Sequence, residues 1–193
     1  MNIVNLVDIS LGHPFRGKVT ESPGSPVLAV QMKDVSPEYG VEWSKCKHVA
    51  LEGKKPPDWL QAGDILLATR GSSNYAVLVD SAPPEGLSAV ATPHFYVLRA
   101  KQASILPAYL HWWLNQRPCQ RHFEAHAEGT HTKSIRRAVL EEVPLVVPSV
   151  REQQTVAEFS ASINRQNSLL KQQLANNLAL QTAIAGDLLT KHR

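Results

Sequence analysis

The chain has 193 residues, of which 43% are hydrophobic and 19% are charged, and its formal net charge is +3. This composition supports a buried core and excludes an intrinsically disordered chain, while the length leaves little room for two full domains. The small positive charge does not by itself indicate nucleic acid as a partner.

Two features bear on where the protein works. Cys46 and Cys119 are far apart, without a CxxC pair or a Cys/His cluster at zinc spacing, so we expect neither a disulfide framework nor a structural zinc site. The first residues lack the basic start and continuous apolar run of a signal peptide, and no stretch has the roughly 18 apolar residues of a membrane span. We therefore expect a soluble protein of the cytoplasm with no membrane partner.

Short β-branched and aliphatic runs, separated by Pro, Gly, Asn and Asp, fill most of the chain before residue 149. This alternation of apolar runs and turn residues is typical of strands. Helical patterns do not separate the runs, which favours a small curved sheet or barrel with large loops over a βαβ arrangement. The expected strands lie within residues 26–35, 64–71, 75–80, 87–100 and 143–148.

Apolar side chains recur at helical spacing over residues 106–114, which predicts a helix. Adjacent tryptophans on a helix point about 100° apart, so at most one of Trp112 and Trp113 is expected to be fully buried. We place Trp113 in the core with Leu110 and Leu114, and Trp112 at an interface.

Residues 149–193 contain no proline and are rich in Gln, Leu, Ala and Asn. They predict one long helix that begins at Ser149, whose hydroxyl can cap the first turn, while Glu152 suits the positive end of the helix. The whole chain is therefore expected to have an α+β fold, with a β-rich domain over residues 1–148 and a long helix over residues 149–193.

Apolar residues form one stripe along this helix. At about 1.5 Å per residue the helix would be roughly 60 Å long, and such a stripe needs a surface on which to pack. We expect two copies of the chain to pair through it as a homodimer, with its polar members setting the register; the alternative is a helix folded back across its own domain. The expected interface residues are Ile163, Asn167, Leu170, Leu174, Leu178 and Leu188.

Catalytic motifs are scarce. The sequence has no GxGxxG, GxxxxGK[ST], HExxH or GxSxG pattern. His122, Glu124 and His126, with His131 nearby, could bind a divalent metal in a hydrolase. The same residues are also explained as surface histidines on a basic segment that faces DNA. We expect no catalytic residue, no metal and no cofactor.

Basic and polar residues cluster in three loop-like segments, at residues 13–18, 69–75 and 129–137. Lys and Arg can neutralise phosphates, hydroxyls and amides can bind phosphates or base edges, and glycine allows close approach of the backbone. Each cluster alone could be an ordinary solvated turn, but their joint occurrence favours DNA binding. The candidate residues are Arg16, Lys18, Arg70, Ser72, Ser73, Asn74, Tyr75, Thr130, His131, Thr132, Lys133, Arg136 and Arg137.

The order of several segments resembles that of DNA specificity subunits of type I restriction-modification systems. Those subunits present a Gly-Asp pair followed by aliphatics and an Arg-Gly turn, then a Leu-Pro aromatic helix, a Gly-Ser/Thr loop, a proline-ended apolar strand, and Glu-Gln opening a long helix. The matching residues here are Gly63, Asp64, Arg70, Gly71, Leu106, Pro107, Tyr109, Gly129, Thr130, Pro144, Pro148, Glu152 and Gln153.

The resemblance implies a target recognition domain over residues 1–148 that binds double-stranded DNA, and a spacer helix over residues 149–193. Family members usually carry two of each, so this chain resembles half a specificity subunit. The family architecture implies antiparallel pairing of the long helices, and hence a two-fold symmetric homodimer and a bipartite palindromic target. It also implies a methyltransferase partner that supplies the S-adenosylmethionine chemistry and, in restricting systems, a restriction subunit, while this chain catalyses nothing.

Three other functions stay open at the level of sequence. A stand-alone DNA-binding regulator would bind DNA without a methyltransferase, an oligomerising scaffold would show no salt-dependent affinity for DNA, and a hydrolase using His122, Glu124 and His126 would lose activity with a chelator.

Overall fold

A computed structural model describes residues 3–51, 56–129 and 132–191. It confirms the expected α+β class. The strands are β1 (Val7–Leu11), β2 (Val27–Val30), β3 (Val35–Ser36), β4 (Gly40–Val41), β5 (Lys47–His48), β6 (Ile65–Ala68), β7 (Arg70–Gly71), β8 (Ala76–Leu78), β9 (Ser88–Ala91), β10 (Phe95–Ala100) and β11 (Lys133–Ser134). The helices are α1 (Pro107–Leu114), α2 (Arg117–His126), α3 (Arg137–Glu141) and α4 (Val150–Lys191), with short 3-10 helices η1 (Ile3–Asn5), η2 (Met32–Asp34) and η3 (Trp43–Lys45).

The chain divides into two compact units, Met1–Ala157 and Glu158–Arg193. The division falls inside α4, whereas the sequence pattern puts the boundary at residue 148. The first turns of α4 belong to the globular unit because Gln153 is fully buried and Val156 packs against the core.

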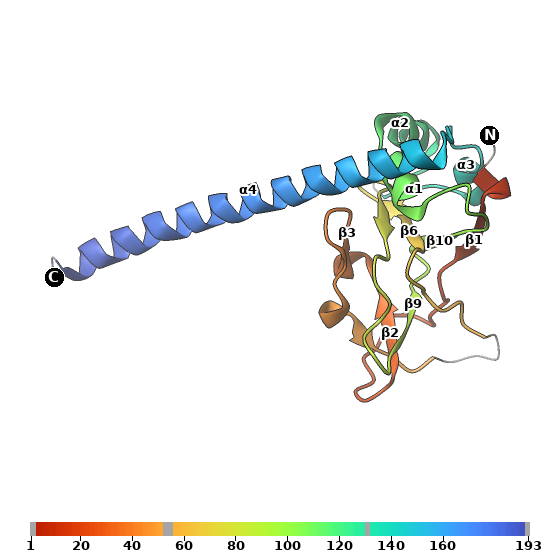
Figure 1. Ribbon diagram of the computed structural model, residues 1–193. Coiled ribbons are helices and arrows are strands. Elements are labelled where there is room, and N and C mark those ends of the chain that lie inside the picture. The colour runs from red at the N-terminus through yellow and green to blue at the C-terminus, as the bar shows by residue number, and fades with distance from the viewer. Residues whose placement is uncertain (1–2, 52–55, 130–131, 192–193) are drawn as a thin grey trace. The chain divides into compact units, whose positions relative to one another are not determined.

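An antiparallel sheet in the order β1-β10-β6-β8 forms the centre of the globular unit. Strand β6 is buried on both faces, because Ile65 and Leu67 belong to one hydrophobic cluster and Leu66 and Ala68 to the other. The first cluster includes residues of α1, α2 and α3, and the second includes residues of β2 and β9. Figure 1 shows these helices on one side of the sheet and β2 and β9 on the other.

The expected strand at residues 87–100 is two strands, because the chain turns between β9 and β10. Strand β9 pairs in parallel with β2, while β10 pairs with β1 and β6 in the central sheet. The end of β1 crosses this corner, where Gly12 donates to the Phe95 carbonyl at 3.0 Å. A Cβ at Gly12 would lie 2.0 Å from the Thr92 carbonyl oxygen, so only glycine permits this crossing.

The expected strand at residues 143–148 is wrong. This segment pairs with no strand, because two of its residues are prolines without an N–H and three of its carbonyls accept side-chain hydrogen bonds. Trp113 Nε1 donates to the Pro144 carbonyl at 2.8 Å, and the Tyr109 hydroxyl donates to the Val146 carbonyl at 2.8 Å. The segment is therefore held against α1 by side chains.

The tryptophan assignment is also wrong. The expected helix is present as α1, with Leu110 and Leu114 buried, but Trp112 and Trp113 are both half-buried and Tyr109 takes the core position. The indole N–H of Trp113 needs an acceptor, and it reaches the Pro144 carbonyl at the surface.

A buried ion pair fixes the turn that leads into β6. The carboxylate of Asp64, 1% exposed, accepts hydrogen bonds of 2.7 Å from both Nε and Nη2 of Arg99 on β10. It also accepts one from the Gln61 backbone N–H at 2.8 Å. The paired carboxylates raise the pKa of Arg99 above its ordinary value. Asp58 forms a second ion pair with the same guanidinium, with 3.2 Å between its Oδ1 and Nη1 of Arg99, and its side chain is 44% exposed.

The start of α4 follows the expected capping pattern. The Ser149 hydroxyl accepts from the Glu152 backbone N–H at 3.3 Å, and the Glu152 carboxylate accepts from the Ser149 backbone N–H at 2.9 Å. One turn later, Gln153 donates to the carbonyls of Ser104 and Pro148 and accepts from the Leu106 N–H. This buried amide ties the start of α4 to the start of α1.

The second unit consists of the remainder of α4. Its heptad positions place Ile163, Leu170 and Ile184 in one row with Asn177, and a neighbouring row contains Asn167, Leu174, Gln181 and Leu188. Within the described residues these apolar side chains are exposed, from 39% for Ile163 to 69% for Leu174. No helix in the described part of the chain is long and apolar enough to cross a membrane.

Candidate nucleic-acid interface

A two-stranded ribbon extends from the central sheet. Strand β6 bends at Thr69 and continues as β7, which pairs with β11 in antiparallel register, Arg70 opposite Ser134 and Gly71 opposite Lys133. The pairing continues at the bend, where Ile135 donates to the Thr69 carbonyl at 2.9 Å. Because β6 is buried on both faces, the core fixes the base of this ribbon.

The ribbon separates the expected DNA-binding residues onto two faces. Residues opposite each other in a ladder share a face, and successive residues alternate. Arg70 and Ser134 therefore share one face, while Lys133 lies on the other with Gly71. Gly71 has a φ of +132°, a backbone conformation that glycine adopts most easily.

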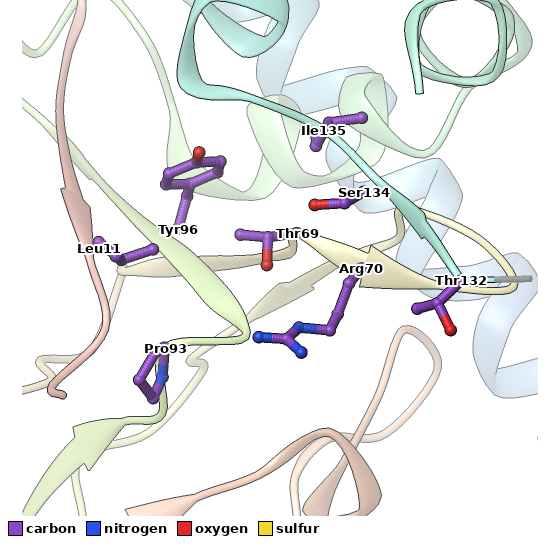
Figure 2. Close-up of a pocket in the computed structure, with 8 residues that line it drawn as sticks. All are labelled: Leu11, Thr69, Arg70, Pro93, Tyr96, Thr132, Ser134 and Ile135. Atoms are coloured by element: carbon purple, nitrogen blue, oxygen red, sulfur yellow. The ribbon is translucent and has the colours of Figure 1, made fainter. Parts of the chain in front are cut away.

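The Arg70 face of the ribbon forms one wall of an open pocket of about 370 Å³. Figure 2 shows the Arg70 guanidinium directed across this pocket toward Pro93, with the Thr69 hydroxyl beside it. Three hydroxyls of threonine and serine and several apolar side chains complete the wall. The lining residues are Leu11, Thr69, Arg70, Pro93, Tyr96, Thr132, Ser134 and Ile135.

The clusters at residues 69–75 and 129–137 contain four lysines and arginines, which differ in whether they form ion pairs. Arg136 forms an ion pair with Glu128, which lowers the pKa of that carboxyl, and Arg137 Nε lies 2.7 Å from Glu141. Among the residues that the structure describes, Arg70 and Lys133 have no carboxylate within ion-pair distance, and both are exposed. Of these four residues, Arg70 and Lys133 are therefore the ones without a carboxylate partner in the described part of the chain.

His94, next to the pocket, adds no positive charge beside Arg70. Burial and the charge of Arg70 lower the pKa of His94 below its ordinary value, so its imidazole is neutral at pH 7. Its Nδ1 is buried without a hydrogen-bond partner among the described residues. Arg70 therefore lies beside neutral groups.

A second cavity of about 470 Å³ adjoins the first, because Leu11 lines both. It includes Arg137 and the first residues of the loop after β1, His13 and Pro14. Arg16 and Lys18 lie farther along that loop and are exposed. The structure thus brings the start of the first basic cluster close to the other two.

Two expected DNA-binding residues face inward instead. Asn74 is 5% exposed, and its Nδ2 donates to the Ala68 carbonyl at 2.9 Å, which secures the turn after β7. Tyr75 packs against the second hydrophobic cluster, where burial raises the pKa of its hydroxyl. These inward positions give both side chains a structural role, and a DNA contact by either of them stays a prediction.

The other expected residues have the following positions. Ser72 and Ser73 are exposed in the turn between β7 and β8, and Thr132 is exposed beside β11. Thr130 and His131 lie outside the described residues. Sequence reasoning missed Thr69, Ser134 and Ile135, which lie inside two of the basic clusters. It also missed Leu11, Pro93 and Tyr96, which come from distant segments; the only signal for these was the apolar end of β1 next to the first basic cluster.

Two of the histidines considered for a hydrolase bind backbone carbonyls. His122 Nε2 contacts the Val139 carbonyl at 2.8 Å and His126 Nδ1 contacts the His122 carbonyl at 2.8 Å, so one nitrogen of each ring is occupied as a donor. No three His, Cys, Asp or Glu side chains in the described ranges gather where they could share a metal ion. Burial also raises the pKa of both cysteines, Cys46 and Cys119, to about 12, which keeps their thiols protonated.

Comparison with known proteins decides the family. The model of the type I restriction modification DNA specificity domain matches residues 48–179, which is more than half of the chain. The chain belongs to this family. The resemblance seen in the sequence is thereby confirmed. No match was found among curated protein sequences.

Solved structures of type I systems share the fold of this specificity chain. A chain of a type I R-M system, studied for its complex assembly and conformational transition, has a TM-score of 0.64 and 17% identity over 91% of this chain and 40% of its own length. The S subunit from M. genitalium has a TM-score of 0.56 and 17% identity over 88% and 40% of the two chains. The HsdS subunit from Thermoanaerobacter tengcongensis has a TM-score of 0.59 and 16% identity over 89% and 38%.

The specificity chain therefore spans about two fifths of the length of these structures. The matched range, residues 48–179, includes the ribbon, Arg70, Lys133 and most of α4, whereas Arg16 and Lys18 precede it.

Proposed function

We propose that the chain is one half of a specificity subunit that directs a type I methyltransferase, and the restriction subunit where the system has one, to a bipartite DNA target. The globular unit binds one half-site. The methyltransferase supplies the S-adenosylmethionine chemistry, and this chain itself is not catalytic. Membership of the DNA specificity family supports this role.

The ribbon β7–β11 carries the proposal for DNA binding. Arg70 and Lys133 are exposed, lie on opposite faces of the ribbon and have no acidic partner among the described residues. A two-stranded ribbon fits the major groove of B-DNA. Lys133 has a long side chain that can reach the phosphates at the rim of the groove, and Arg136 and Arg137 can exchange their glutamates for phosphates.

The exposed stripe on α4 supports a homodimer. A second copy of the chain carries a stripe of the same chemistry, and an antiparallel pair of helices would place two identical globular units at opposite ends. The DNA target would then be palindromic, with two half-sites at a fixed separation. Asn167 and Asn177 would set the register of the pair, since a polar residue in a seam tolerates few partners.

Replacing Lys133, Arg136 and Arg137 together by alanine should weaken DNA binding on every sequence. Each phosphate that the variant no longer neutralises should reduce the slope of log affinity against log salt by about 0.9. Most of this reduction should already occur in Lys133→Ala, because Lys133 has no glutamate to displace. Fluorescence anisotropy with a labelled duplex between 50 and 200 mM salt, the range over which about 10³-fold changes occur, measures both quantities.

Lys101→Ala is the matched control, because Lys101 is a surface lysine already paired with Asp8 at 3.0 Å. It should leave the slope unchanged. If the triple variant has the melting temperature of the wild type and also the same affinity for DNA, the ribbon does not contact DNA.

A further inference from the structure

The pocket on the Arg70 face of the ribbon differs from an ordinary phosphate site. Phosphates are usually held by several cations, by clustered backbone N–H groups or by a helix N-terminus. Among the lining residues of this pocket Arg70 is the one cation, and the others are three hydroxyl-bearing residues, one tyrosine and apolar side chains. This mixture suits the edge of a base pair more closely than a phosphodiester.

The backbone that carries Arg70 is anchored by hydrogen bonds. Arg70 pairs with Ser134 in the ribbon, and the preceding Thr69 donates its backbone N–H at 2.8 Å and its hydroxyl at 3.1 Å to the His94 carbonyl. The guanidinium extends from this anchored backbone across the pocket (Figure 2). An arginine held in this way can present two parallel N–H groups to one acceptor pair.

The acceptor pair that matches two parallel N–H groups in the major groove is O6 and N7 of guanine. Leu11 is 56% exposed at the edge of the pocket and offers an apolar contact of the kind that a thymine methyl group accepts. The hydroxyls of Thr132 and Ser134 can bind either donors or acceptors on the flanking bases.

We propose that this pocket reads a guanine, and that Arg70 is the residue that determines this position of each half-site; the inference rests on the proposed function. Lys133, on the opposite face of the ribbon, contributes affinity without sequence preference. One face of the ribbon, with Arg70, therefore recognises a base, and the other face, with Lys133, binds phosphate.

The test is selection of bound duplexes from a pool with a randomised region, carried out with the full chain and with Arg70→Lys. Lysine keeps the charge but cannot present two parallel N–H groups. The wild type should enrich a motif in which one position of each half-site is guanine. Arg70→Lys should lose the preference at that position by about ten-fold to a hundred-fold, with the other positions and the salt slope unchanged.

Lys133→Ala is the control from the other face, and it should enrich the same motif as the wild type with lower affinity. If Arg70→Lys keeps the guanine preference, or loses affinity equally at all positions, Arg70 contacts phosphate and the inference is wrong while DNA recognition stands. If the wild type itself enriches no motif, the proposed function fails, and this inference fails with it. Thermal melting of each variant confirms that the fold is intact.

Discussion

Replacing Asp64 by alanine should lower the free energy of unfolding of the globular unit by about 3 kcal/mol, as expected when one partner of a buried ion pair is removed. The change would leave the Arg99 guanidinium without the carboxylate that binds both its Nε and its Nη2, and would also remove the acceptor of the Gln61 N–H. The low end of the usual range of about 3–5 kcal/mol applies, because the side chain of Arg99 is 35% exposed and water can partly replace the missing carboxylate. Urea denaturation of both proteins measures the difference.

Asp58→Ala is the control for this prediction, since Asp58 meets the same guanidinium but is 44% exposed. Its removal should cost at most about 1 kcal/mol, as for exposed ion pairs. Equal losses in the two variants would mean that burial does not set the strength of this cluster.

Replacing Leu170 and Leu174 by aspartate should dissociate the proposed dimer. Each buried leucine contributes about 1.5 kcal/mol or more, so the four leucines of a dimer would lose about 6 kcal/mol, which is roughly 10⁴-fold in affinity. The introduced carboxylates would add the cost of burying unpaired charge. Sedimentation velocity at micromolar concentration should then show a dimer for the wild type and a monomer for the variant.

Gln172→Asp with Ala183→Asp is a control of equal charge on the opposite side of α4, since these positions lie roughly half a helical turn from the stripe at about 100° per residue. This variant should remain dimeric. A monomeric wild type, or a dimeric Leu170→Asp, Leu174→Asp variant, would contradict helix pairing and favour a helix folded back on its own domain.

The helices α1 and α4 could be predicted from sequence because their signals are local. The start of α4 depends on Ser149 and Glu152, three residues apart, and its length follows from the absence of proline after residue 148. Strand β1 was missed because its stability comes from pairing with β10, where Val7 lies opposite Ala100. A pairing over that distance leaves no mark on a short window of sequence.

The site was predicted only in part, for a similar reason. Glycine, serine and asparagine occur both in DNA-binding loops and in turns held by their own hydrogen bonds, and Asn74 proves to be of the second kind. Whether Arg70 and Lys133 share a face depends on the register of the ribbon. The pocket then combines Arg70 with Leu11 and Pro93, which come from distant parts of the sequence.

Several residues that carry the family resemblance prove to be parts of the framework. Asp64 is buried against Arg99, and Gln153 bonds three backbone groups at the junction of α1 and α4. These two residues of the family motifs therefore hold the domain together, whereas Arg70, which belongs to the same motifs, is exposed. The side chains that we propose as choosing the DNA sequence lie on the exposed ribbon.

The measurement that tests the central claim most directly is the methylation pattern of DNA treated with a type I methyltransferase subunit from the same genome, with and without this chain. Single-molecule sequencing of the treated DNA identifies every methylated position. We predict that methylation requires the chain and falls on one bipartite palindromic motif whose half-sites are a fixed distance apart. Methylation at the same positions without the chain, or none with any such subunit although the chain binds DNA, would contradict its role as a specificity subunit.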